Sequence, residues 1–134
     1  MIYRLLFIGR WRVKFIFAVD GYDIDEILNE LYDLDTDYAD MMTAYKMMRA
    51  GEYNKALSSC NPYTKEALVV TGPVSDSSEF IDSLVHEIHH VAVAIAEELG
   101  VDLESETPAY IAGDAARELA DVVCEIGCHR CHSK

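Results

Sequence analysis

The sequence predicts an α+β fold, in which a small and mostly antiparallel sheet in the N-terminal part is packed with helices. Short apolar runs with the alternation of strands occur within the first twenty residues and again at 55–71. Segments with helical spacing of apolar residues lie between these runs and after them. At 134 residues the chain is most simply one domain, large enough to bury a core without disulfides.

The N-terminal part divides into strands at its two ends and helices between them. Residues 11–17 alternate, which places Trp11 and Val13 on one face and Arg12 on the other. Gly9 before them allows either a hairpin turn or a bulge in one long strand. The predicted elements are strands at 3–8 and 11–17, helices at 23–34 and 38–50, a weak strand at 55–59 and a stronger one at 66–71.

The C-terminal part is predicted to be a pair of helices. The first covers 77–99 and stops at Gly100, and the second covers 108–124 with Pro108 at its first position. The first helix is apolar over much of its surface, which is typical of a buried helix. We therefore expect the histidines that it also carries to lie in the interior or at the floor of a cleft.

The charge excludes some classes of partner. The net charge is −13 and the isoelectric point is near 4.6, whereas a nucleic-acid-binding protein needs clustered Lys and Arg to neutralise phosphates. We expect no nucleic-acid partner. No run of 18 or more apolar residues occurs, so no membrane span is expected either. The N-terminus lacks the unbroken apolar run of a signal peptide, and a cytoplasmic location is the default expectation.

The motif that points to chemistry is His-Glu-x-x-His at 86–90. In a helix His86 and His90 lie one turn apart on the same face, where two imidazoles can bind one Zn²⁺. Glu87 lies one position round from His86, within reach of a zinc-polarised water that it could deprotonate as general base. The pattern indicates a zinc metallopeptidase. His89 could line the cleft, but its position on the helix makes it a poor ligand.

A catalytic zinc needs a third protein ligand and an open position for water. The candidate ligands are the carboxylates after residue 100, namely Asp102, Glu104, Glu106 and Asp114.

The motif followed by a short loop and a glutamate at the start of the next helix resembles the gluzincin clan of zinc metallopeptidases. The resemblance implies that Glu106, sixteen residues after His90, is the third zinc ligand, with Glu104 as the next candidate. Gluzincins carry an Asp four residues after this glutamate, where the present chain has Tyr110. Tyr110 could instead stabilise the oxyanion of the reaction, or it could simply anchor two helices. Asp114 is one candidate for the missing second-shell acceptor.

The chain is also similar to small peptidase-like proteins of phages and gut bacteria. The resemblance implies a minimal zincin-like metallopeptidase domain over 1–134, with the sheet and supporting helices in 1–72, the metal-binding pair of helices in 73–124 and a tail in 125–134. It further implies that the strand at 66–71 is the edge strand along which an extended peptide aligns.

The tail contains a cluster of cysteine and histidine. Cys128-His129-Arg130-Cys131-His132 matches the C-x-x-C-H pattern of haem attachment. A cytochrome needs a haem-enclosing fold around this motif, whereas the motif here ends two residues before the chain does, so we expect no haem. A second zinc site from Cys124, Cys128, Cys131 and His132 is chemically possible, and a loose tail of reactive thiols is the alternative.

The predicted function is thus zinc-dependent hydrolysis of peptide bonds, with a peptide or protein as substrate, Zn²⁺ as cofactor, Glu87 and Tyr110 as catalytic residues, and His86, His90 and Glu106 as ligands. The first alternative is a non-catalytic zinc-binding protein that uses its acidic surface to bind a partner, and the second is a helical protein without metal. The sequence does not indicate an oligomeric state.

Overall fold

The computed structural model describes residues 1–132, and their side chains as far as residue 127. The elements are β1 (Ile2–Ile8), β2 (Trp11–Phe17), α1 (Ile24–Asp33), α2 (Tyr38–Ala50), β3 (Ala56–Asn61), β4 (Glu66–Thr71), α3 (Ser77–Leu99) and α4 (Thr107–His132). The predicted α+β class is confirmed. No helix in this part of the chain is long and apolar enough to cross a bilayer.

The four strands form one mixed sheet in the order β1-β2-β4-β3. β1 pairs antiparallel with β2, and β3 with β4, whereas the central strands β2 and β4 run parallel. The pairings are thus mostly antiparallel, with a parallel pair at the centre. Gly9 has a φ of 59° in the turn between β1 and β2, so the hairpin is the correct alternative and the bulge is not.

One prediction about the sheet was wrong. The strand at 66–71 is not an edge strand, because β4 lies between β2 and β3 and is almost wholly buried. Its unbroken apolar run, Ala67 to Val70, is typical of a strand that is covered on both faces. The edge on that side of the sheet is β3, the weaker of the two predicted strands.

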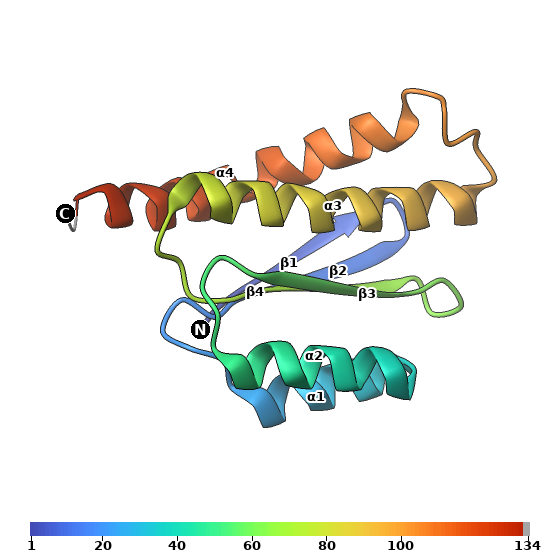
Figure 1. Ribbon diagram of the computed structural model, residues 1–134. Helices are drawn as coiled ribbons and strands as arrows, with labels where there is room; N and C mark the ends of the chain where they lie inside the picture. Colours follow the sequence, from blue (N-terminus) through green and yellow to red (C-terminus); the bar gives the residue numbers. More distant parts are fainter. Residues whose placement is uncertain (133–134) are drawn as a thin grey trace.

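Helices cover both faces of the sheet (Figure 1). α3 and α4 lie on one face, where Phe15, Phe17 and Leu119 belong to one apolar core. α1 and α2 lie on the other face, over a second core that contains Ile16, Leu68 and Val70. The alternation of β2 therefore supplies both cores, since successive side chains point to opposite faces.

The ends of α3 follow from local chemistry. Asp76 is the N-cap, and its side chain accepts hydrogen bonds from the backbone N–H groups of Ser78 and Glu79. Gly100 closes the helix with a φ of 73°, a conformation that favours glycine. α4 begins one residue before the predicted start and continues to His132 rather than ending at 124, so most of the predicted tail is helical.

Candidate metal centre

α3 presents His86 and His90 on one exposed face, one helical turn apart. The expectation of buried histidines was wrong. The sides of α3 that carry Leu84, Ile88 and Val91 are the buried ones, and they pack against the sheet and α4. Ile88 is two residues from each histidine, and at about 100° per residue it points to roughly the opposite side. The histidine face is therefore left to solvent.

The two imidazoles are arranged like a pair of metal ligands. Their Nε2 atoms lie 3.0 Å apart, and the ring planes are inclined by 80°. Two nitrogens that each lie about 2.05 Å from a tetrahedral zinc are separated by about 3.3 Å. The same distance allows one ring to donate its N–H to the other when no metal is bound. Small ring rotations would interconvert the two arrangements.

Glu87 points from α3 toward the edge of the sheet. The residue is only 9% exposed, and Ser58 Oγ on β3 donates a hydrogen bond of 3.3 Å to its Oε2. One carboxylate oxygen and one nitrogen from each histidine all lie within 4.8 Å of one another. In the described part of the chain, His86, Glu87 and His90 are the one group of three such side chains with this spacing.

The structure does not bring Glu106 into this group. Glu106 lies just before α4 and accepts a hydrogen bond of 3.1 Å from Tyr110 Oη. The start of α4 packs at the far end of α3, where Thr107 and Leu99 line one pocket. Leu99 is nine residues after His90, about 13 Å along the helix axis. Glu106 therefore stays a prediction as zinc ligand, and it would have to move to reach the histidines.

The other predicted residues after position 100 also lie outside the group. Tyr110 is 67% exposed and contacts Glu106 instead of the histidines. Asp102 accepts a hydrogen bond from the backbone N–H of Glu104, and Asp114 pairs with Arg117 at 3.0 Å. α4 packs against the side of α3 that carries Ile88, which is why none of these carboxylates joins the histidine pair.

Sequence reasoning missed the contribution of β3. Ser58 contacts Glu87, and Cys60 lies two residues further along the same strand, packed against the core beneath α3. Burial raises the pKa of the Cys60 thiol to about 11, and the charge of Glu87 adds to this effect. Cys60 is thus a neutral thiol at pH 7. Nothing in the short, polar sequence of β3 identified these neighbours, because the strand's position beside α3 is a tertiary property.

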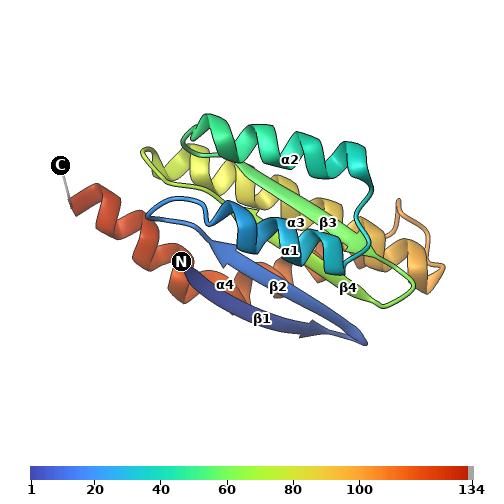
Figure 2. The ribbon, with the colours of Figure 1, turned by 90° about the horizontal axis from the view of Figure 1, so that it is seen from below.

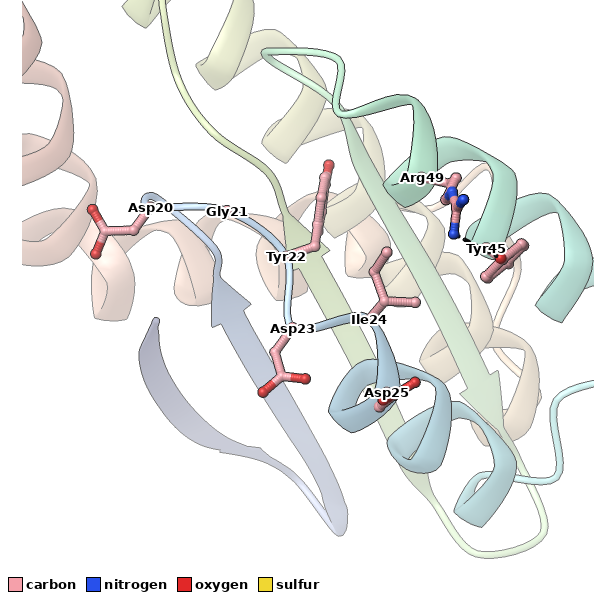
Figure 3. Close-up of a pocket in the computed structure, with 8 residues that line it drawn as sticks. All are labelled: Asp20, Gly21, Tyr22, Asp23, Ile24, Asp25, Tyr45 and Arg49. Carbon is pink, nitrogen blue, oxygen red and sulfur yellow. Dashed lines mark hydrogen bonds between the residues drawn. The ribbon is translucent and has the colours of Figure 1, made fainter.

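A pocket of about 690 Å³ lies away from the motif, on the α1–α2 side of the sheet (Figure 3). The loop after β2 forms it together with two side chains of α2, Tyr45 and Arg49. Burial raises the pKa of Tyr22 in this loop to about 12, with a smaller contribution from Glu52. The pocket contains no residue of the predicted site.

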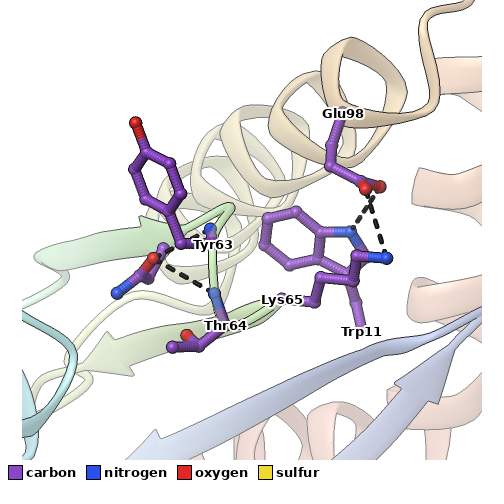
Figure 4. A network of polar contacts seen from close by, with 6 residues as sticks. Trp11, Tyr63, Thr64, Lys65 and Glu98 are labelled. Carbon is purple, nitrogen blue, oxygen red and sulfur yellow. Dashed lines mark hydrogen bonds and ion pairs between the residues drawn. The ribbon is translucent and has the colours of Figure 1, made fainter.

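Contacts at both ends of α3 fix the position of the histidine face relative to β3. Near its N-terminal end, Ser83 Oγ donates a 2.7 Å hydrogen bond to the backbone oxygen of Asn54. Near its C-terminal end, Glu98 pairs with Lys65 at 3.3 Å and accepts a hydrogen bond from Trp11 Nε1 (Figure 4). These partners precede β3, follow it and begin β2, so α3 is attached to the sheet at several points.

The cysteine cluster cannot be placed as a site. Cys124 is exposed on α4. The side chains of Cys128, Cys131 and His132 lie outside the described residues, and a second zinc site there stays a prediction.

Comparison of the chain with protein-family models, with curated proteins and with solved structures finds no match. The resemblance to gluzincins therefore stays a prediction from the His-Glu-x-x-His motif.

Proposed function

We propose that this protein is a zinc-dependent hydrolase of peptide bonds. The observation that carries the proposal is the His86–His90 pair, with its Nε2 atoms 3.0 Å apart and the Glu87 carboxylate beside it. Imidazole nitrogen is a preferred zinc donor. These donors fit two of the three protein ligands of a catalytic zinc.

The side chains of α3 and β3 would have separate roles in hydrolysis. His86 and His90 would hold the zinc, whose chemistry when bound is to make a water molecule more acidic. Glu87 would accept a proton from the attacking water and return it to the leaving amine. Ser58 holds Glu87 Oε2 and so orients the carboxylate. The exposed face of α3 leaves room for a substrate above the histidines.

β3 is the strand along which an extended peptide would align in this proposal. It is the edge of the sheet next to α3, and Ser58 connects it directly to Glu87. A peptide that adds to this edge pairs through its backbone, which gives weak sequence preference. The substrate class is therefore a peptide or an unfolded segment of a protein.

One observation favours a second candidate, a zinc-binding protein without catalysis. Among the described residues no third side chain joins the two histidines except Glu87 itself. If Glu87 ligates the metal, it is no longer available as a base, and the site fixes structure instead.

The experiment that separates the two candidates uses Glu87→Gln in the full chain. Zinc content after dialysis and cleavage of quenched peptides or denatured casein are measured together. For a peptidase, Glu87→Gln keeps zinc and loses at least about a hundredfold in rate. For a structural site, Glu87→Gln loses zinc, and the parent protein cleaves nothing. His89→Ala is the matched control, because His89 is exposed beside the pair but outside the group. Less than a tenth of an equivalent of zinc in the parent protein would reject both candidates.

A further inference from the structure

β1 forms the open edge of the sheet opposite β3. Tyr3, Leu5 and Phe7 form an apolar row on one face of this strand, with exposed fractions of 41%, 46% and 69%. Seen from the α1–α2 side, β1 lies outside the area that these two helices cover (Figure 2). Tyr3 is nevertheless held in place, because its Oη donates a 2.8 Å hydrogen bond to Glu26 and Lys14 Nζ lies 5.4 Å from its ring centre.

The backbone of the same three residues faces outward. Arg12 N–H donates to Lys65 O in the β2–β4 pairing, so the even-numbered residues of β2 direct their backbone groups to β4. The odd-numbered residues of β2 therefore pair with β1, where their partners are the even-numbered residues from Ile2 to Ile8. The N–H and C=O groups of the row point to the open edge. The one partner recorded there within residues 1–127 is the Arg4 guanidinium, which donates to Tyr3 O.

We propose that a second copy of this chain pairs with β1, antiparallel and about a two-fold axis through Leu5. In this register Leu5 lies opposite Leu5 of the second copy, and Tyr3 lies opposite Phe7. All three positions have outward backbone groups, so each facing pair exchanges both of its hydrogen bonds. The two sheets become continuous, and the apolar rows of both copies lie side by side between the two α1 helices.

The row lacks the devices that usually protect an edge strand. Natural edges carry charges, proline or bulges that prevent pairing with another chain. Tyr3, Leu5 and Phe7 are none of these, and the one charged side chain of β1 is that of Arg4, which donates to Tyr3 O. A carbonyl oxygen has two lone pairs, so Tyr3 O can still accept a hydrogen bond from a second chain. Cross-strand aromatic and aliphatic pairs such as Tyr3 with Phe7 are the pairs that stabilise antiparallel strands. The other edge, β3, is flanked by the proposed site and has no such exposed row.

Charge favours a second copy at this edge. Residues 1–19 contain four basic residues and no acidic one. Since the net charge of the whole chain is −13, residues 20–134 have a net charge of −17. Three of the four basic residues are paired within the chain, Arg4 with Asp121, Arg12 with Glu66 and Lys14 with Glu30. On the α4 side, Asp114, Arg117 and Glu118 line a pocket with Leu5 and Phe7, and Arg117 pairs with Asp114. Charges of both signs therefore flank β1, whereas two copies that meet elsewhere bring mainly acidic surfaces together.

The exposed row is small for an interface. With about 200 Å² for each whole side chain, the exposed fractions amount to roughly 300 Å² per copy, against about 800 Å² per partner in a stable complex. We therefore expect a weak dimer that dissociates on dilution.

Sedimentation velocity of the full chain, from micromolar to millimolar concentration, tests the proposal. We expect a monomer at the low end and a dimer at the high end. Phe7→Lys and Leu5→Lys should abolish the dimer while the circular dichroism spectrum stays the same. Tyr63→Lys is the control, because Tyr63 is 96% exposed but lies in the turn between β3 and β4. A monomer at every concentration, or a dimer that survives both β1 variants, would overturn the proposal.

A second measurement tests the register. Facing hydrogen-bonded residues have Cα atoms about 5.5 Å apart, a distance that a disulfide can span. Leu5→Cys should therefore form a disulfide between the two substituted positions under mild oxidation, found by peptide mapping. Phe7→Cys should not, because Phe7 faces Tyr3 of the second copy. A link in the Phe7→Cys protein but not in the Leu5→Cys protein would refute the two-fold register.

Discussion

Replacing Ser58 by alanine should uncouple the edge strand from Glu87. Ser58 Oγ is 3.3 Å from Glu87 Oε2, and Glu87 is 9% exposed. A hydrogen bond to a charged group contributes about 1.5–3 kcal/mol, but this one is longer than the usual range for O–H···O, so the low end applies. We therefore expect Ser58→Ala to lower the free energy of unfolding by about 1–2 kcal/mol.

The assay is urea denaturation of the metal-free protein in a double-mutant cycle with Glu87→Met, which keeps the size of Glu87 but removes its acceptor. The coupling between Ser58→Ala and Glu87→Met should be about 1 kcal/mol. Ser59→Ala is the matched control, because Ser59 contacts Thr36 rather than Glu87 and should not couple. A coupling below about 0.3 kcal/mol for Ser58, or an equal one for Ser59, would refute the reasoning. If the protein is a peptidase, Ser58→Ala should also lower kcat more than it changes KM, and Ser58→Thr should restore it.

Three further predictions concern the metal and the buried thiol. His86→Ala and His90→Ala should each weaken zinc binding more than about a hundredfold in competition with a chromophoric chelator, since even outer partners of a zinc ligand contribute about 10–100-fold; His89→Ala should bind zinc normally, and equal losses in all three would contradict the assignment. Glu106→Gln should leave zinc affinity unchanged in the arrangement described, because Glu106 lies outside the histidine group; a tenfold loss would show that the loop before α4 does reach the metal. Burial raises the pKa of Cys60 from 9.0 to about 11, so its stabilising effect is complete below pH 9 and is lost as the pH rises to about 11; the fall in the free energy of unfolding over this range should be smaller in Cys60→Ala, and an unchanged fall would exclude Cys60 as its cause.

Much of the fold follows from local patterns in the chain. The alternation of β2, the apolar spacing of α1 and the capping residues at Asp76 and Gly100 mark elements that the structure contains within a few residues. The end of the last helix was predicted at 124, but α4 continues to His132, because the sequence after 124 contains no strong stop signal. Helix ends of this kind depend on weak competing preferences.

The sequence pattern alone did not identify which strand forms the edge of the sheet next to α3. β4 has the stronger strand sequence and was expected at the edge, yet strong apolar strands belong at the centre, where both faces are covered. β3 became the edge because its half-polar sequence tolerates solvent on one side.

The sequence by itself determined the local part of the candidate site. Five consecutive residues of one helix include His86, Glu87 and His90, and helical geometry alone places both imidazoles on one side and the carboxylate beside them. Tertiary structure decided how segments that are distant in sequence meet. It leaves the histidine face exposed, brings Ser58 to Glu87, and keeps Glu106 near the far end of α3. The physical reason is that spacing within a helix is fixed by its hydrogen bonds, whereas the side on which α4 packs is chosen by the fit of apolar surfaces along its whole length.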